Sequence, residues 1–452
     1  MPPTTRFLTN PSPADLPKTA DVVIIGGGPA GTAAAWAIER AAPGTRIVIV
    51  EQSSQLAAGS SLASLENYRT CWAAPCLHRL MQRSIDVFHN AEEYFGEGTK
   101  LGLKEQGYLF IAFTEAQAAK LKDDVDHLHR CGLTHTEYLN ASDIASRYPW
   151  LGSRVIAAKY DPIAGWMDSN ALVYALANAT QSTTILLETK NASIRTAGSR
   201  VLGVSTANGE IDAPNVVIAA GANARAIGRT AGIELPIVMR PRQSFTTGWR
   251  HEAYPEDAPC VISAAPFPHV RPEAQSGAIF GYEYKWNTGK IPNHNGERTD
   301  ALIDPIWPVE QLRDPRFPSL TLSLMAKQFG HKPGEGFADP RYLRGIYHRA
   351  GYYVYRDNAY LTLPDGTTER YDSQRAIIDK WPEIDGLFLS IAHVGHGIMS
   401  APAAGEILAS RILRQPLPDE SYVGFNLDAP YVEHDAGGLS DNGIRAAEPV
   451  SD

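Results

Sequence analysis

Three glycines near the start of the chain have the spacing that a dinucleotide diphosphate requires. They form the pattern Gly26-x-Gly28-x-x-Gly31. In such a pattern the first glycine permits a tight turn, the second lets the backbone approach a pyrophosphate, and the third lets a helix pack closely on a strand. Glu51 follows where a carboxylate can accept both hydroxyl groups of an adenosine ribose. These four residues predict a binding site for a dinucleotide whose ribose carries no 2′-phosphate.

A second glycine turn, Gly395-His396-Gly397, lies near the other end of the chain. It is followed by an apolar helix, whose positive end would point beyond the sheet edge. If the first turn holds the adenylate of FAD, the N–H groups of Gly395–Met399 can meet the N1/C2=O edge of the isoalloxazine, where negative charge develops on reduction. The alternative is a tight turn with a surface histidine; the first motif favours the flavin site. His393 and His396 are candidate proton acceptors beside that flavin.

Apolar strands and helices must position both turns. The predicted elements are the strands Asp21–Ile25, Arg46–Val50, Asn215–Ala220 and Gly386–Ile391 and the helices Thr32–Arg40 and Ser400–Leu413. Because they come from the start, middle and end of the chain, the predicted fold class is α/β: a discontinuous Rossmann-type FAD-binding domain with an interleaved α+β substrate domain built on an antiparallel sheet. The predicted division is 19–105, 155–238 and 350–415 for the FAD-binding domain, 106–154 and 239–349 for the substrate domain, and 416–452 for a C-terminal arm.

Hydrophobic periodicity predicts the remaining elements. They are helices at Leu77–Phe95, Glu115–Cys131, Ser169–Thr180 and Leu320–Phe329, and strands at Gln106–Ala112, Ile185–Thr189 and Val201–Thr206. Residues 236–285 alternate like an antiparallel sheet, and residues 286–345 read as an insertion rich in Pro, Gly and charge. The acidic tail beyond Gln415 is expected to be an arm or disordered.

Composition excludes several other classes of protein. A net charge of −9, with no basic stripe, argues against nucleic acid or an anionic membrane as a main partner. No apolar run approaches the roughly 20 residues of a membrane span, and the N-terminal segment does not read as a secretion signal. The four cysteines lack paired spacing, which is typical of reduced thiols in a cytoplasmic protein. The histidines show no metal-ligand spacing, so no metal site is predicted.

Further motifs accompany the two turns, and together they resemble one known family. They are Glu51-Gln52, Gly59-Ser60-Ser61 with Arg69 and the Leu80–Glu93 helix, Gly165-x-x-Asp168, Ala219-Ala-Gly221-Ala222, Pro241-Arg-Gln243, Arg271-Pro272, and Gly386-Leu-Phe-Leu…Gly395-His-Gly397-x-Met399…Pro402-Ala-x-Gly405. This set resembles the FAD-dependent D-amino-acid oxidase (DAO) superfamily, especially the branch with sarcosine oxidases and dye-linked L-proline dehydrogenase. The resemblance covers about residues 20–413. It is specific for the superfamily and leaves the substrate open.

The resemblance implies FAD as cofactor and oxidation of a C–N bond in an amine or amino acid. The substrate's α-hydrogen would leave as a hydride to flavin N5, and the imine would then hydrolyse. Arg69 matches the arginine that binds the substrate carboxylate, a role that suits its planar fork; the alternative is a structural or surface salt bridge. Matched position by position, the residues that would contact FAD are Gly26, Gly28, Pro29, Ala30, Gly31, Glu51, Gln52, Gly59, Ser60, Ser61, Ala219, Gly221, Gly395, His396, Gly397, Ile398 and Met399.

Three departures from the family pattern limit what the resemblance implies. Thr367–Tyr371 holds no cysteine that could tether the flavin, so FAD is expected to bind non-covalently. Ile279 replaces a lysine that helps oxygen react with reduced flavin, although Lys285 lies nearby, so an acceptor other than O2 is plausible. Met399 replaces a second cation for the substrate carboxylate, so the substrate lacks that carboxylate or is anchored from elsewhere.

A Tyr- and Arg-rich strand near residue 350 offers such an anchor. Arg349 and Arg356 could pair with an anion, and Tyr352, Tyr353 and Tyr355 could form an aromatic wall beside a cationic amine. The alternative is an edge strand in which the tyrosines alternate and pack.

Three functions follow as hypotheses. The first is an FAD-dependent amine or amino-acid oxidase or dehydrogenase, with O2 or another electron acceptor. The second is the catalytic subunit of a heteromeric dehydrogenase that passes electrons to a partner. The third is a flavoprotein without amine oxidation that acts as an assembly or scaffold factor. A homo- or hetero-oligomer is compatible with each, and the sequence specifies neither the amine nor its stereoisomer.

Overall fold

Short runs of valine and isoleucine form the inner strands of the first sheet, because β-branched side chains suit strands buried on both faces. The computed structural model describes residues 5–264, 268–282, 302–357, 360–362, 368–370 and 373–429. The sheet order is β1 (Arg6–Thr9), β9 (Thr183–Leu187), β3 (Ile47–Val50), β2 (Val22–Ile25), β13 (Val216–Ile218), β22 (Leu387–Ile391) and β21 (Ile377–Lys380). All neighbours run parallel except β21 and β22. The start, middle and end of the chain therefore meet in one α/β sheet, as predicted.

Helices cover this sheet, and two of them pack closely because small residues meet. The first sheet and its helices are called the first body. These helices are α1 (Pro29–Ala41), α2 (Pro75–His89), α3 (Ala91–Phe95), α6 (Ser169–Asn178), α7 (Ala224–Thr230) and α9 (Ala401–Ile412). A Cβ at Gly405 of α9 would lie 2.3 Å from the carbonyl oxygen of Ala33 in α1, so only glycine permits this contact. The predicted helix Leu77–Phe95 is interrupted at Asn90, whose side-chain amide donates to the carbonyl of Asp86 and competes with the helix backbone.

A second, largely antiparallel sheet and the helices packed with it form the second body. Its order is β18 (Tyr347–Arg356), β14 (Ile237–Thr247), β17 (Gly277–Tyr282), β16 (Pro268–Glu273), β15 (Cys260–Ile262), β5 (Tyr108–Ala112), β7 (Ala157–Asp161) and β6 (Glu137–Asn140). The helices of this body are α4 (Glu115–Arg130), α5 (Ala141–Arg147) and α8 (Phe317–Phe329). β7 and β18 belong to this sheet, although the predicted division assigns residues 157–161 and 350–356 to the FAD-binding domain. The domain boundaries themselves stay a prediction.

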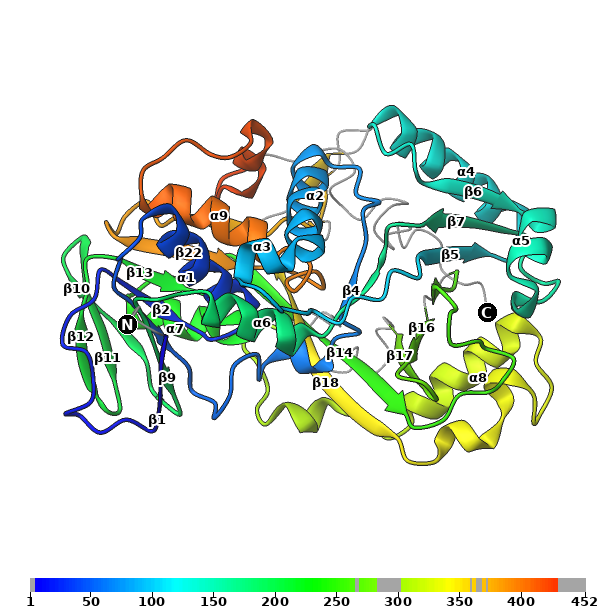
Figure 1. Ribbon diagram of the computed structural model, residues 1–452, viewed down its shortest axis with the longest axis horizontal. Coiled ribbons are helices and arrows are strands. Elements are labelled where there is room, and N and C mark those ends of the chain that lie inside the picture. Colours follow the sequence, from blue (N-terminus) through cyan, green and yellow to red (C-terminus); the bar gives the residue numbers. More distant parts are fainter. Residues whose placement is uncertain are drawn as a thin grey trace.

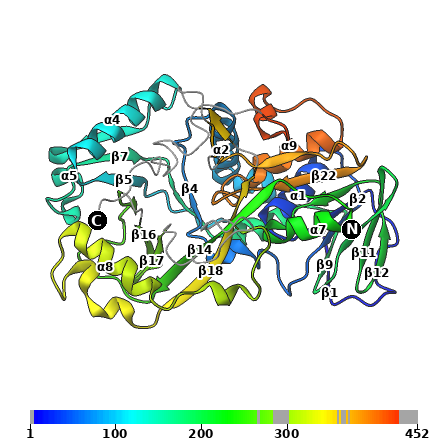
Figure 2. The same ribbon diagram turned by 180° about the vertical axis from the view of Figure 1, so that it is seen from behind.

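Two long strands connect the bodies. Figures 1 and 2 show β14 and β18 running together from the first body into the second. Their register pairs Ile237 with Arg356 at one end and Thr246 with Tyr347 at the other. Ile237 packs in the core beneath the first sheet, whereas Phe245 packs in the core of the second body. The pair therefore joins the two hydrophobic cores through one continuous piece of sheet.

Smaller sheets and the tail complete the described structure. The strands are β10 (Ser193–Ala197) with β11 (Arg200–Thr206) and β12 (Gly209–Asp212), β4 (Asn67–Tyr68) with β8 (Gly165–Trp166), and β19 (Tyr360–Thr362) with β20 (Thr368–Arg370). Tyr422 and Phe425 are buried in the core around α9, so the expected arm begins with a packed segment. The predictions at Lys285, at Thr367 and Tyr371, and beyond residue 429 lie outside the described residues. No helix in the described part is long and apolar enough to cross a membrane.

Candidate functional site

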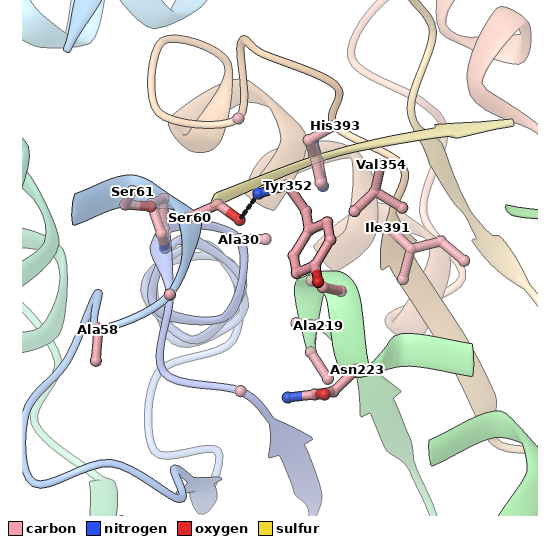
Figure 3. A pocket seen from close by; sticks show the side chains of 18 of the residues that line it. Ala30, Ala58, Ser60, Ser61, Ala219, Asn223, Tyr352, Val354, Ile391 and His393 are labelled. Atoms are coloured by element: carbon pink, nitrogen blue, oxygen red, sulfur yellow. Dashed lines mark hydrogen bonds between the residues drawn. The ribbon is translucent and has the colours of Figure 1, made fainter. Parts of the chain in front are cut away.

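A cavity of about 460 Å³ lies at the carboxyl ends of β2, β3, β13 and β22, where β18 closes it. Figure 3 shows its labelled side chains converging from α1, the segment before β4, β13, β18 and β22. Predicted cofactor residues that line it are Gly26, Gly28, Pro29, Ala30, Glu51, Gln52, Gly59, Ser60, Ser61, Ala219, Gly221, Gly395, Gly397 and Ile398. Gly31, His396 and Met399 are not among the described lining residues. The crevice outside the carboxyl ends of the strands is where doubly wound folds bind their ligands.

Two glycines of the first turn have different surroundings: Gly31 is in tight backbone contact, whereas Gly28 faces open space. A Cβ at Gly31 would lie 1.9 Å from the carbonyl oxygen of Gly26, so α1 can approach the turn only if residue 31 is glycine. At Gly28, no described atom lies within 4 Å of an added Cβ, and the residue lines the cavity. Gly28 is also the residue before Pro29, the first residue of α1. The turn therefore leaves the helix N-terminus open to an anion, which suits a diphosphate.

Glu51 follows β3 directly and is held rigidly at the cavity. One carboxylate oxygen accepts from the backbone N–H of Gly27 at 2.8 Å, and the other accepts from the N–H of Ser53 at 2.8 Å. Each oxygen of a carboxylate has a second acceptor position, so Glu51 can still accept two hydroxyl groups. This geometry fits the ribose of a dinucleotide.

The 3₁₀ segment Ser60–Ala63 is fixed to the strands that connect the bodies. The Ser60 hydroxyl accepts from the backbone N–H of Tyr352 at 3.0 Å, as Figure 3 shows. The Ser244 hydroxyl donates to the carbonyl of Ala63 at 2.7 Å, and Arg349 donates to the carbonyl of Leu62. Arg349, predicted as a possible anion partner, therefore contributes to the wall through this backbone contact.

The loop after β22 has an uncommon backbone conformation. Ala392 and Val394 have φ angles of 59° and 51°, a left-handed region that costs about 1–3 kcal/mol for residues other than glycine. The N–H of Val394 donates to the carbonyl of Val354 in β18 at 3.0 Å, and a Cβ at Gly395 would lie 2.5 Å from the ring of Tyr353. Tyr353 thus packs directly on the second glycine turn and lines the cavity.

His393 lies in the cavity wall on this strained loop. Its Nε2 lies 3.0 Å from the hydroxyl of Ser390. Burial lowers the pKa of His393 to about 4, so its imidazole is neutral near pH 7. Proton transfer from an aliphatic ammonium group to a base of that strength is unfavourable at neutral pH, whereas a neutral ring can exchange a hydrogen bond with a ligand.

His396 is more deeply buried and is not among the described residues that line the cavity. Its Nε2 lies 2.6 Å from the carbonyl oxygen of Gln374, so Nε2 carries the proton, and its ring meets the Trp72 ring at 5.1 Å between centroids. Burial lowers the pKa of His396 to about 3. The predicted role of His396 as a proton acceptor beside the flavin has no support from this position.

The pKa of His396 predicts a pH dependence of stability. The pKa is depressed in the folded state, so between pH 6.5 and about 3 the unfolded chain binds a proton that the folded chain does not. The free energy of unfolding should therefore fall as pH drops through this range, with a contribution of about 1.4 kcal/mol per pH unit from this group. His396→Gln, which keeps a side-chain N–H donor, should reduce that slope in urea titrations. An unchanged slope would show that His396 is not the titrating group.

Arg69 lies where side chains of both bodies meet, and it is not among the cavity-lining residues that the structure describes. It is buried, and its guanidinium carbon lies 4.2 Å from the ring centroid of Trp72. The rings of Tyr108 and Phe110 in β5 flank it at 5.9 and 5.8 Å. Because Trp72 also contacts His396, Arg69 is one side chain away from the Gly395–Gly397 turn.

Two other predicted catalytic residues occupy structural positions. Arg356 is buried and donates to the backbone carbonyls of Arg375, Ala376, Asn426 and Leu427, so it fastens the C-terminal segment beside β18. Met399 is buried in the core around α9. Neither residue is carried into the proposed substrate site.

Two residues that line the cavity, Trp307 and Arg242, were not among the predicted site residues. Trp307 lines the cavity and its indole N–H donates to the side-chain oxygen of Asn223 at 3.0 Å. Nothing in the sequence connects Trp307 with the site, because it lies in the region read as an insertion. Arg242 also lines the cavity, with its guanidinium 5.2 Å from the ring centroid of Tyr353. Its place in the motif Pro241-Arg-Gln243 was a signal that could have identified it.

Comparisons with known proteins agree with this geometry. Dimethylglycine dehydrogenase of Rattus norvegicus is 27% identical over 278 residues, which cover 60% of this chain and 32% of that protein. The chain thus spans about a third of that relative. Sarcosine oxidase subunit beta of Rhizobium meliloti is 22% identical over 439 residues, covering 95% of this chain and 92% of that one. L-proline dehydrogenase from P. horikoshii shares the fold, with a TM-score of 0.71 at 22% identity over 91% of this chain and 98% of that one.

The family model described as "FAD dependent oxidoreductase" matches residues 21–411. This range contains both glycine turns and every strand of the first sheet except β1. FAD, the cofactor that the family implies, fits the open approach at Gly28 and the free acceptor positions of Glu51. The resemblance stated from the motifs is confirmed: the chain belongs to the DAO family of FAD-dependent oxidoreductases.

Proposed function

We propose that this protein uses FAD to oxidise the C–N bond of an amine or amino acid. The observation that carries the proposal is that a single cavity is bounded by both glycine turns, one at residues 26–31 and the other at residues 395–397. This arrangement suits an extended dinucleotide with its adenosine near Glu51 and its ring system near Gly395. The relatives named for dimethylglycine, sarcosine and L-proline support an amino compound as substrate.

The bound flavin would accept the substrate's α-hydrogen as hydride at N5. Residues of this chain would bind and orient the substrate for that transfer. Arg69 would pair with a substrate carboxylate through its planar guanidinium, and Tyr353 would form the wall beside the amine. Since His393 is too weak a base to deprotonate an ammonium group, we infer that the substrate reacts as the neutral amine and that His393 exchanges a hydrogen bond with a ligand in the cavity.

Anaerobic reduction of the purified holoprotein tests the proposal. We expect a yellow protein whose flavin absorbance near 450 nm bleaches on addition of at least one member of a panel of amino acids and secondary amines. Dithionite is the control for a reducible flavin. Bleaching by dithionite but by no amine would contradict the proposed function and favour the assembly or scaffold role.

Admission of air to the amine-reduced protein separates oxidase from dehydrogenase. Rapid return of the colour indicates an oxidase, and slow return together with fast reoxidation by a dye indicates a dehydrogenase. A dehydrogenase subunit that serves a partner is the second candidate. It is favoured by the nearly full-length similarity to sarcosine oxidase subunit beta and by the apolar Ile279, which is buried on β17 opposite Arg271.

A further inference from the structure

The backbone that follows Arg69 packs against the second body, where Cys71 and Ala73 share a buried cluster with Tyr108 and Phe110 of β5. β4 ends at Tyr68, which pairs with Gly165 of β8. The chain then leaves the strand, and the N–H groups of Thr70 and Cys71 are buried at the junction. Buried backbone N–H groups need hydrogen-bond acceptors, so this segment has to find them outside regular secondary structure.

Asp161 supplies these acceptors from the second body. It is the last residue of β7 and its exposed fraction is 0%. Its carboxylate accepts from the N–H of Thr70 at 2.7 Å and from the N–H of Cys71 at 3.1 Å. It also lies 2.8 Å from the hydroxyl oxygen of Thr70. One buried carboxylate therefore holds the two residues immediately after Arg69.

The hydroxyl of Thr70 forms a second link in the same network. It lies 2.5 Å from Nε2 of His135, which itself is 3.8 Å from Asp161. A carboxylate can only accept, so the hydroxyl donates its single proton to Asp161 and accepts from Nε2–H of His135. Thr70 is thus fixed through its side chain as well as through its backbone.

The side chain of Arg69 is fixed by the same segment. The indole N–H of Trp72 donates to the carbonyl of Arg69 at 3.1 Å, and the Trp72 ring lies against the guanidinium. On the other side lies Phe110, whose ring also contacts Lys159 at 4.3 Å. Lys159 forms a buried ion pair with Asp124. Buried charges are costly unless they are bonded, so Lys159 and Asp124 hold each other in place beside the ring of Phe110.

We propose that Asp161, acting through Thr70, is the positioning residue of Arg69 and sets the affinity of the site for the substrate's carboxylate. The inference rests on the proposed function and extends it. The residue that binds the carboxylate belongs to the first body, and its placement is set by the sheet of the second. A shift of the segment by a fraction of an ångström would misalign a bidentate pair, whose strength depends on its geometry.

Thr70→Val and Thr70→Ser form the matched test. Valine has nearly the shape of threonine but carries a methyl group in place of the hydroxyl, whereas serine keeps the hydroxyl. In the holoprotein, Thr70→Val should raise the KM of a carboxylate-bearing substrate about 10-fold with little change in kcat, and Thr70→Ser should restore the wild-type KM. A merely structural role would lower Tm or flavin content and leave KM unchanged, and that outcome would overturn the proposal.

A double-variant cycle asks whether Thr70 acts through Arg69. In an Arg69→Leu background, Thr70→Val should cause no further rise in KM, because the group that it positions is gone. Effects that multiply in the double variant would show that Thr70 acts independently, and would overturn the inference.

A binding measurement decides the inference separately from the proposed function. If no amine bleaches the flavin of the wild-type protein, the proposed function fails. Acetate or benzoate can still be titrated, with binding read from the shift of flavin absorbance. Thr70→Val should weaken that binding about 10-fold, in line with the loss of a hydrogen bond in the charged network. Equal affinity in wild type and variant, or no carboxylate binding in the wild type, overturns the inference.

Discussion

Replacement of Gly28 by alanine is expected to raise the Kd of FAD about 100-fold, a loss of about 2.7 kcal/mol, while the Tm of the apoprotein stays unchanged. No described atom lies within 4 Å of a Cβ at this position, so the folded chain itself tolerates the methyl group. The methyl group would project into the cavity at the N-terminus of α1, where a diphosphate needs close approach to the backbone. Quenching of FAD fluorescence on titration with apoprotein measures the Kd.

Two other glycines provide the controls. An added Cβ at Gly248 also meets no described atom within 4 Å, and the residue is not among those that line the cavity, so Gly248→Ala should leave both Kd and Tm unchanged. Gly31→Ala should lower Tm, because its Cβ would lie 1.9 Å from the carbonyl oxygen of Gly26. If Gly28→Ala binds FAD as tightly as the wild type, the first turn is not the diphosphate site.

Replacement of Arg69 by leucine should lower kcat/KM for an amino-acid substrate by about 10²–10³-fold without release of the flavin. A bidentate guanidinium–carboxylate pair in a buried site supplies free energy of this order, and its removal leaves the substrate's charge uncompensated. Stopped-flow measurement of flavin reduction under anaerobic conditions separates the loss of substrate affinity from the loss of the reduction rate. For an amine without a carboxylate, Arg69→Leu should lower kcat/KM far less.

The matched control is an arginine with the same kind of ring contact elsewhere. Arg341 lies 4.0 Å from the ring centroid of Trp249 in the second body. Arg341→Leu should leave flavin reduction unchanged, and Arg69→Lys should retain part of the activity because the charge remains but the planar fork is lost. Wild-type kinetics in Arg69→Leu would remove Arg69 from the substrate site.

The first glycine turn could be predicted from the sequence because its conformation depends only on residues close to it in the chain. The turn at Gly26–Gly31 depends on backbone clearance within one strand–turn–helix unit, and spacing alone reveals it. Arg356 shows the opposite case. It was predicted as a possible anion partner on a Tyr- and Arg-rich strand, but four backbone carbonyls from two distant segments converge on its guanidinium. Periodicity gives the face of a strand and does not reveal which segment covers that face.

Asp161 illustrates a second limit of prediction from sequence. It stands next to no second acid that suggests paired-carboxylate chemistry, and its partners are backbone N–H groups about ninety positions earlier. Backbone donors leave no mark in a pattern of side-chain types. The same reasoning applies to Trp307, which reaches Asn223 from a segment whose composition predicts only an insertion.

The order in which the walls of the cavity are encoded bears on how the protein is made. β2 and α1 emerge from the ribosome long before β22 and the Gly395–Gly397 turn. A nascent chain therefore cannot enclose its prosthetic group until the Gly395–Gly397 turn has been made, and until then β13 has no β22 beside it. Loading of the prosthetic group must follow synthesis of that turn, and partly made chains would depend on chaperones for protection from aggregation.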